Sequence, residues 1–236
     1  MFTKSAAFYD AIYASLGKDY AAEAQRLHEL IQQHKRSPGH ALLDVACGTG
    51  SHLALLQQWH DVEGLDLDPG MLEIARQRCP DVPLHQADMV DFDLRRRYDV
   101  IVCLFSSIGY VRTRPRLRQA LHTMARHLHP GGVLVVEPWL TPEVYRAGGV
   151  HAHFVDRPHL KIARMNICAV EDGLSVLDFH YLVAMPAGIE HFTERHELGL
   201  FSHDEYLAAF VARRLEVVYD PQGLMGRGLY VGICPL

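Results

Sequence analysis

A short apolar run that opens directly into a glycine-rich loop constrains the fold of this chain more than any other feature. Residues 41–45 are typical of a buried strand, and Cys47-Gly48-Thr49-Gly50 follows at once. In open parallel sheets, ligands bind beyond the carboxyl ends of the strands, which is where such a loop lies. Glycine at positions 48 and 50 lets the backbone approach a ligand closely, because no side chain intervenes. The pattern predicts an α/β protein that binds a ligand after its first strand.

Strands and helices alternate through residues 1–138. Further strands are predicted at 62–67, 82–86, 98–105 and 133–136, and helices at 19–35, 51–58, 69–79 and 115–128. Alternation of this kind implies right-handed crossovers and a mostly parallel sheet with helices on both faces. The expected fold class is therefore α/β, with a doubly wound, Rossmann-like sheet.

The hydrophobic pattern changes after Pro138. From about residue 151 to residue 200 apolar residues alternate with a period of two, and β-branched and aromatic residues are common, which is typical of strands. We expect antiparallel strands inserted into the sheet as a cap or dimerisation element. Residues 1–138 and 201–236 would then form one domain, and residues 139–200 the inserted cap. A helix at 202–210 and strands at 215–219 and 229–233 are expected to complete the domain.

The loop favours S-adenosylmethionine over a dinucleotide as the ligand. A dinucleotide site needs G-x-G-x-x-G, with a third glycine for close packing of the helix, and Leu53 stands at that position here. S-adenosylmethionine has no phosphate and makes no such demand. Its ribose needs a carboxylate at the end of the second strand, where Asp66 stands. The loop residues Asp44, Gly48 and Gly50, together with this carboxylate, predict a site for S-adenosylmethionine.

Two later positions suit the adenine ring of that cofactor. Asp88 follows the third strand along the chain, and its carboxylate can accept a hydrogen bond from the adenine amine. Met71 or Met89 can cover a face of the ring. The alternative is a glycine-rich turn in some other doubly wound protein, and it would not account for all of these elements in this order.

The composition disfavours several kinds of partner. The net charge of −5 provides no general attraction to nucleic acid or to an anionic membrane. No apolar run approaches the length of about 20 residues that spans a bilayer. The five cysteines are scattered, which suits reduced thiols in the cytoplasm better than a disulfide framework. The sixteen histidines show no zinc-ligand spacing, so no metal site is expected.

Several segments spread along the chain match one group of enzymes. They are Tyr9-Asp10, Gly17-Lys18-Asp19-Tyr20, Leu42-Leu43-Asp44-Val45-Ala46-Cys47-Gly48-Thr49-Gly50, Asp88-Met89, Phe105-Ser106-Ser107-Ile108-Gly109-Tyr110, Val135-Val136-Glu137-Pro138-Trp139 and Gly226-Arg227-Gly228-Leu229. On these segments the chain resembles the N,N-dimethyltransferases of desosamine and mycaminose biosynthesis, over nearly its whole length. The glycine-rich loop is shared with many methyltransferases, whereas the last three segments are much more specific.

The resemblance implies a fold, a reaction and roles for individual residues. The fold would be that of class I methyltransferases, and the reaction would convert the primary amine of a dTDP-linked deoxysugar to a dimethylamine in two rounds. A homodimer is also implied. Tyr9, Ala46, Asp66, Asp88, Met89 and Leu104 would contact the cofactor, Tyr20, Glu137, Trp139 and Arg227 would line the sugar-nucleotide site, and Tyr110 would lie near the amine.

The chemistry of the residues is compatible with these roles and leaves alternatives open. Tyr110 can hydrogen-bond an amine and orient its lone pair, or it can be a loop tyrosine that satisfies its own hydroxyl. Arg227, between two glycines, can hold a diphosphate with two parallel hydrogen bonds, although a single arginine is most often solvated. The other functions considered are methylation of another small amine or hydroxyl, and cofactor binding without activity. The acid Glu137 at a strand end favours an enzyme.

Overall fold

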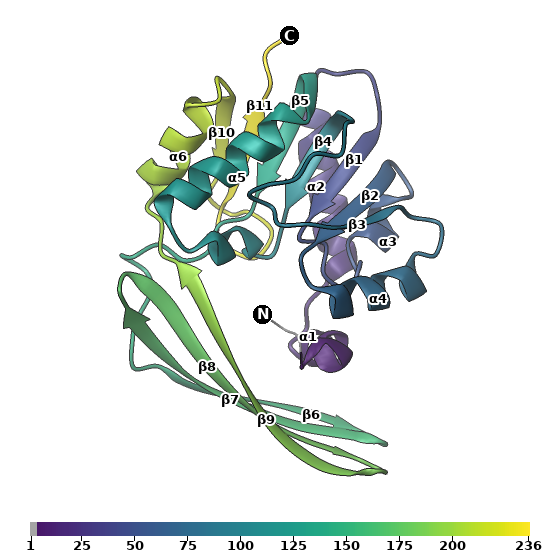
Figure 1. The fold of residues 1–236 in the computed structure, drawn as a ribbon, viewed down its shortest axis with the longest axis vertical. Helices are drawn as coiled ribbons and strands as arrows, with labels where there is room; N and C mark the ends of the chain where they lie inside the picture. Colours follow the sequence, from purple (N-terminus) through teal and green to yellow (C-terminus); the bar gives the residue numbers. More distant parts are fainter. Residues whose placement is uncertain (1–3) are drawn as a thin grey trace.

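A seven-stranded sheet forms the centre of the molecule, and a second sheet lies apart from it (Figure 1). The computed structural model describes residues 4–236. The strand order is β10-β11-β5-β4-β1-β2-β3, in which the neighbours among β1 to β5 are parallel and β10 and β11 are antiparallel additions. The strands are β1 Ala41–Val45, β2 Asp61–Asp66, β3 Leu84–Gln86, β4 Tyr98–Cys103, β5 Leu128–Val136, β10 Glu216–Asp220 and β11 Leu229–Ile233. The predicted α/β class and doubly wound sheet are confirmed.

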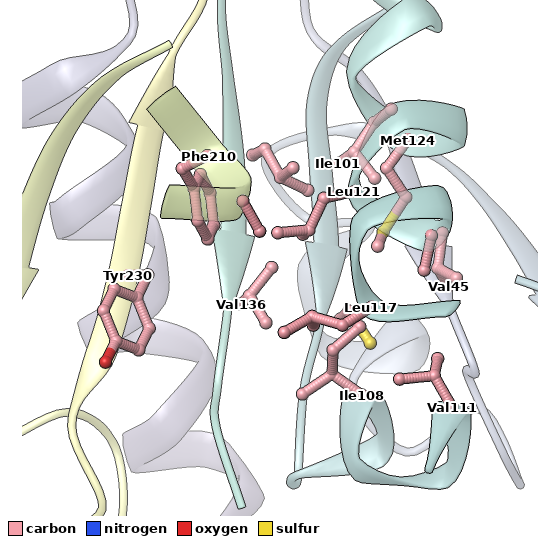
Figure 2. Close-up of a cluster of buried hydrophobic side chains, with 14 of the residues drawn as sticks. Val45, Ile101, Ile108, Val111, Leu117, Leu121, Met124, Val136, Phe210 and Tyr230 are labelled. Carbon is pink, nitrogen blue, oxygen red and sulfur yellow. The ribbon is translucent and has the colours of Figure 1, made fainter. Parts of the chain in front are cut away.

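Helices cover both faces of this sheet. Figure 2 shows Leu121 and Met124 of α5 pointing toward Ile101 of the sheet, in a buried cluster to which Phe210 of α6 also belongs. On the other face α2, α3 and α4 pack against a second buried cluster. The helices are α1 Tyr9–Ser15, α2 Tyr20–His34, α3 Leu53–Leu56, α4 Pro69–Arg78, α5 Arg114–Arg126 and α6 His203–Val211, with short 3-10 turns at Ala6–Phe8 and Ser107–Val111. Among helices within residues 4–236, none is both long and apolar enough to cross a membrane.

Two of the predicted elements differ in length from the structure more than the others do. The helix expected at 51–58 is confined to Leu53–Leu56. The strand expected at 133–136 begins at Leu128, because Tyr98 of β4 pairs with Leu128 before the register shifts at Val100. Pro130-Gly131-Gly132 therefore lies inside β5 and does not precede it. The apolar pattern marked only the regular part of the strand.

The cap is a separate four-stranded antiparallel sheet and is not inserted into the central one. Its strands follow one another in the order β6 Val150–Arg157, β7 Leu160–Glu171, β8 Leu174–Met185 and β9 Gly188–Gly199. Consecutive hairpins pair these strands along nearly their whole length. Because the strands satisfy one another's backbone groups, they have no need to join the central sheet. The predicted antiparallel cap is confirmed, whereas the expectation that its strands join the central sheet was wrong.

The first helix, which the sequence did not predict, packs between the two sheets (Figure 1). Ala11 and Ile12 of α1 are buried against Val155, Phe179 and Tyr181 on the inner face of the cap sheet. The helix is only seven residues long, so it has little intrinsic stability and its packing holds it in place. It therefore brings residues from near the start of the chain into the space between the central sheet and the cap sheet.

We expect Leu121→Ala to lower the free energy of unfolding by about 2–5 kcal/mol, because it removes a fully buried side chain and leaves a cavity. The matched control is Val211→Ala, on the exposed side of α6, which should change stability by no more than about 0.5 kcal/mol. Urea unfolding followed by circular dichroism measures both. Equal effects of the two substitutions would contradict the assignment of this core.

Candidate active site

The first cavity lies at the carboxyl ends of the parallel strands and has a volume of about 410 Å³. This is the edge of the sheet where doubly wound proteins bind their ligands. Most of the predicted cofactor residues line it, namely Tyr9, Ala46, Gly48, Asp66, Met71, Asp88 and Met89. The structure therefore brings together residues from α1, the glycine-rich loop and two further strand ends.

The backbone of the glycine-rich loop is held by the neighbouring strand end. The Gly48 amide donates to Asp66 Oδ2 at 2.8 Å, and the Asp68 amide donates to the other carboxylate oxygen, Oδ1, at 2.9 Å. Gly48 has a φ of 56°, and a Cβ there would meet nothing within 4 Å. A side chain would therefore have room at position 48. Glycine is favoured there because it adopts this left-handed backbone conformation without strain.

Gly50 does not line this cavity, and its role is in packing. A Cβ at this position would lie 3.2 Å from the Cβ of Ala75 on α4, and its φ of 75° is also in the left-handed region. Asp44, Leu104 and Tyr20 line a smaller hollow behind the loop, in company with Tyr9, Ala46 and Gly48. The structure thus places Tyr20, predicted for the substrate site, beside the cofactor loop.

Two carboxyl groups beside the glycine-rich loop, the buried Asp44 and the half-buried Asp66, favour a cation there. Burial raises the pKa of Asp44 well above its usual value, and the nearby Asp66 raises it further. Burial also raises the pKa of Asp66, against the hydrogen bonds that it accepts from Asp68 and Gly48. A positively charged ligand would stabilise both carboxylates, whereas a phosphate would be repelled. S-adenosylmethionine carries a sulfonium and an ammonium group and fits this electrostatic environment.

Asp88 is already engaged in an ion pair at the rim of the cavity. Its carboxylate lies 2.9 Å from a guanidinium nitrogen of Arg116 on α5 and accepts from the Val90 amide at 3.1 Å. Sequence reasoning did not single out Arg116, which also lines the cavity. An adenine amine would share the remaining acceptor capacity of Asp88.

A second and larger cavity, of about 1060 Å³, lies between the central domain and the cap. The inner face of the cap sheet contributes Arg164, Phe179 and His196, and α1 contributes Tyr13. Tyr9, Ser107 and Tyr110 line both cavities. The two spaces therefore meet beside Tyr110, so that a donor in one cavity and an acceptor in the other would face each other there.

The larger cavity is rich in cationic side chains although the protein is acidic overall. Lys18 is paired with Glu23 at 2.7 Å, and burial lowers the pKa of its ammonium group. Within residues 4–236, Arg164 and Arg227 form no ion pair with a carboxylate. The cationic side chains that line the cavity are Lys18, Arg26, Arg146, Arg164 and Arg227, against Asp19 and Glu23. Such a lining creates a local site for an anion.

Arg227 and Trp139, both predicted for the substrate site, line the larger cavity together. The guanidinium of Arg227 lies over the Trp139 ring at 5.1 Å and donates to Ser106 Oγ at 3.0 Å. Trp139 in turn donates through Nε1 to Ser175 Oγ of the cap at 2.7 Å. These contacts orient the guanidinium and leave several of its donors for a ligand.

Glu137 is completely buried and does not line either cavity. Its Oε2 accepts from the Phe105 amide at 2.6 Å. Phe105 and Ser106 have φ angles of 53° and 60°, which are unfavourable for residues with side chains. Glu137 therefore stabilises the turn that leads from β4 to Tyr110, and burial raises the pKa of its carboxyl.

The hydroxyl of Tyr110 lies 2.6 Å from Nδ1 of His196, a residue of β9 in the cap. Burial raises the pKa of the Tyr110 phenol well above its usual value, so the neutral form persists. Sequence reasoning missed this partner because the two residues are 86 positions apart and no local pattern connects them. Within residues 4–236, no group of three or more potential metal ligands occurs.

Comparisons with known proteins agree with this geometry. Residues 42–132 match the family model described as a methyltransferase domain. The chain is 45% identical over 228 residues, 95% of either protein, to dTDP-3-amino-3,4,6-trideoxy-alpha-D-glucopyranose N,N-dimethyltransferase of Streptomyces venezuelae. This chain belongs to the family of dTDP-aminosugar N,N-dimethyltransferases. It therefore has the class I methyltransferase fold and uses S-adenosylmethionine as its methyl donor.

Two further members of this family extend the comparison. The chain is 42% identical to dTDP-4-amino-2,3,4,6-tetradeoxy-D-glucose N,N-dimethyltransferase of Saccharopolyspora spinosa, over 95% of this chain and 90% of that protein. The structure of SAM-bound CalS10, an amino pentose methyltransferase from Micromonospora echinaspora, superimposes with a TM-score of 0.87 at 38% identity and covers 96% of both chains. The likeness thus includes the cap as well as the methyltransferase domain.

We expect Asp66→Ala to weaken the binding of S-adenosylmethionine roughly ten- to a hundredfold, because it removes the predicted ribose acceptor and the contact that holds the Gly48 amide. Isothermal calorimetry measures the affinity. Asp61→Ala, at the exposed opposite end of the same strand, is the matched control and should bind as the wild type does. Unchanged binding by the Asp66 variant, or tight binding of NAD by the wild type, would contradict the assignment of the cofactor cavity.

Proposed function

We propose that this enzyme N,N-dimethylates the amine of a dTDP-linked amino-deoxysugar. The observation that carries the proposal is that the anion-attracting cavity meets the cofactor cavity beside Tyr110. A sugar nucleotide needs both features, since its diphosphate requires cations and its amine must reach the methyl donor. The names of the relatives in Streptomyces venezuelae and Saccharopolyspora spinosa describe the same reaction on such substrates.

The chain's own contribution to this reaction is positioning. S-adenosylmethionine supplies a methyl group that is already activated by its sulfonium. Alignment of the attacking amine with that methyl group contributes about 7–11 kcal/mol of the barrier reduction in favourable cases. Tyr110, at the junction of the cavities, is the proposed contact for the amine, and Arg227 with Trp139 the proposed contact for the nucleotide. No further chemical group is needed for the displacement itself.

The names of the two relatives indicate which substrates should be tried in a direct test of this reaction. Their names place the amine at position 3 of one sugar and at position 4 of the other. A panel of dTDP-3-amino and dTDP-4-amino deoxysugars should therefore include an acceptor for this enzyme, and mass spectrometry counts the methyl groups transferred. Faster methylation of a simple amine such as free glycine would contradict the proposal.

We expect Arg227→Ala to raise the Michaelis constant for the dTDP-aminosugar tenfold or more, because a charge-assisted contact to a diphosphate contributes about 1.5–3 kcal/mol. Affinity for S-adenosylmethionine, measured by calorimetry, should be almost unchanged. Arg227→Lys keeps the charge but not the planar fork and should give an intermediate value. The matched control, Arg118→Ala, removes an exposed cation from α5 and should leave both constants unaltered.

Inhibition by dTDP provides a second test of the contact between Arg227 and the diphosphate. If Arg227 binds the diphosphate, then dTDP alone should inhibit the wild type more strongly than the Arg227→Ala variant. Equal inhibition of the two proteins would assign the diphosphate to another part of the cavity.

We also propose that residues 139–200 act as a cap over the substrate and as the contact between two copies of the chain. One face of the cap sheet packs on α1, and the opposite face exposes a row of apolar side chains. The strand register places these side chains on one face. Val150 of β6 pairs with Ile167 of β7, and Ala163 of β7 pairs with both Phe154 of β6 and Leu182 of β8. The outer face of the cap is defined by Val150, Phe154, Met165, Ile167, Leu182 and Ile189. Exposed apolar patches of this kind mark interfaces, and a second copy would cover this one.

We expect the wild type to sediment as a dimer at micromolar concentration and Ile167→Glu to sediment as a monomer. A buried carboxylate at the centre of an apolar interface has no partner and is strongly unfavourable. Val211→Glu is the matched control, since Val211 is 61% exposed and Ile167 is 59% exposed but only Ile167 lies on the cap. A wild type that remains monomeric would contradict this part of the proposal.

The proposed location of the enzyme is the cytoplasm. Cys47, Cys79, Cys103, Cys168 and Cys234 are all free thiols in the structure. Free thiols are typical of a reducing compartment such as the cytoplasm.

A further inference from the structure

The contact between Tyr110 and His196 has a direction, and that direction decides how an amine can bind. A phenol has one hydrogen to donate and lone pairs with which to accept. The Tyr110 hydroxyl lies 2.6 Å from Nδ1 of His196. If Nδ1 carries no proton, the single hydrogen of the phenol points to His196 and the lone pairs of its oxygen remain for the cavity.

Glu194 favours the tautomer in which Nδ1 is the acceptor. Its Oε2 lies 3.6 Å from Nε2 of His196, the ring nitrogen opposite to the one that contacts Tyr110. A carboxylate beside Nε2 stabilises a proton on that nitrogen, so that Nδ1 keeps its lone pair. Burial lowers the pKa of the His196 imidazole, which keeps the ring neutral despite this carboxylate. Arg164, the nearby cation of the cap, acts in the same direction.

Glu194 is also held in place by residues near the start of the chain. It accepts from the Lys4 amide at 2.7 Å and from the Ser5 amide at 3.0 Å, and the Ser5 hydroxyl donates to it at 2.6 Å. Burial raises the pKa of the Glu194 carboxyl, but the contacts with His196, Ser5 and Lys4 together lower it to about 2. The carboxylate is therefore charged at neutral pH and is held beside the imidazole.

We infer that His196 is a positioning residue that makes Tyr110 a hydrogen-bond acceptor toward the amine, an inference that rests on the proposed function. An amine held by its own N–H keeps its lone pair free. A phenol that donated to the amine would occupy that lone pair and block attack. The identity of the residue behind Tyr110 thus determines whether the bound amine is reactive.

The methyl transfer is balanced without a protein base. The nitrogen lone pair forms the new bond to the methyl carbon as the carbon–sulfur bond breaks, and the bonding electrons remain on sulfur. The nitrogen, now an ammonium, keeps its N–H contact with the Tyr110 oxygen and loses a proton to water before the next round. His196 takes no proton in this sequence, so its function depends only on an acceptor at the Nδ1 position.

The test uses two substitutions of His196 with opposite expectations. His196→Phe has nearly the same shape but no acceptor, and it should lower kcat on the dTDP-aminosugar about tenfold, the effect of one hydrogen bond. His196→Asn places an amide oxygen close to the position of Nδ1 and should remain within about threefold of the wild type. Affinity for S-adenosylmethionine should be unchanged in both, and thermal melting shows that each is folded. If His196→Phe does not fold, His196→Leu replaces it.

A double-mutant cycle separates positioning from a general effect on structure. In a Tyr110→Phe background the phenol is absent, so His196→Phe should lower kcat no further. Additive losses, or an Asn variant as impaired as the Phe variant, would overturn the inference. A wild type that methylates no dTDP-aminosugar would instead reject the proposed function, so the two failures are distinguishable.

Discussion

One hydrogen bond, from the Gly48 amide to the Asp66 carboxylate, joins the loop after β1 to the end of β2 and shapes the cavity at this edge of the sheet. β1 and β2 are parallel neighbours, so their carboxyl ends lie at the same edge of the sheet. The left-handed φ of Gly48 turns its amide toward Asp66, and the two oxygens of Asp66 hold both the loop and the start of α4. The same residue supplies a carboxylate to this edge of the sheet, where the backbone amides that it orients surround it.

The N-terminal helix connects this edge to the cap. Asp10 accepts from Thr49 at 2.8 Å and is also paired with Arg78, so that α1 is tied to the glycine-rich loop and to α4. Just before α1 in the chain, the Ser5 hydroxyl donates to Glu194 of β9 at 2.6 Å. Tyr9, which lies between these two attachments, and Tyr13, one turn further along α1, both line the larger cavity. The cap and the central domain thus hold the same short segment, which lines the larger cavity between them.

The features that could be predicted from the sequence are those with a local cause. Asp44 to Gly50, the capped helix that begins after Ser202 and the strand at 229–233 each depend on neighbours in the chain, and their positions are confirmed. The separate cap sheet, the burial of Glu137 and the packing of α1 depend on contacts between distant segments. His196 had no local pattern that could connect it to Tyr110, because only the folded cap brings it there. Periodicity identifies a strand but does not determine which sheet it joins.

An acceptor phenol also limits how many methyl groups the site can add. A primary amine has N–H bonds for Tyr110 and a lone pair for the methyl donor, and a monomethylated amine still has one N–H and a lone pair. A dimethylated amine has a lone pair but no N–H, so nothing holds it against the Tyr110 oxygen in the orientation for attack. Alignment contributes several kcal/mol to such a displacement, and its loss makes a third transfer slow. The polarity that His196 imposes on Tyr110 therefore provides a physical reason for a reaction that proceeds twice and then ends at the tertiary amine.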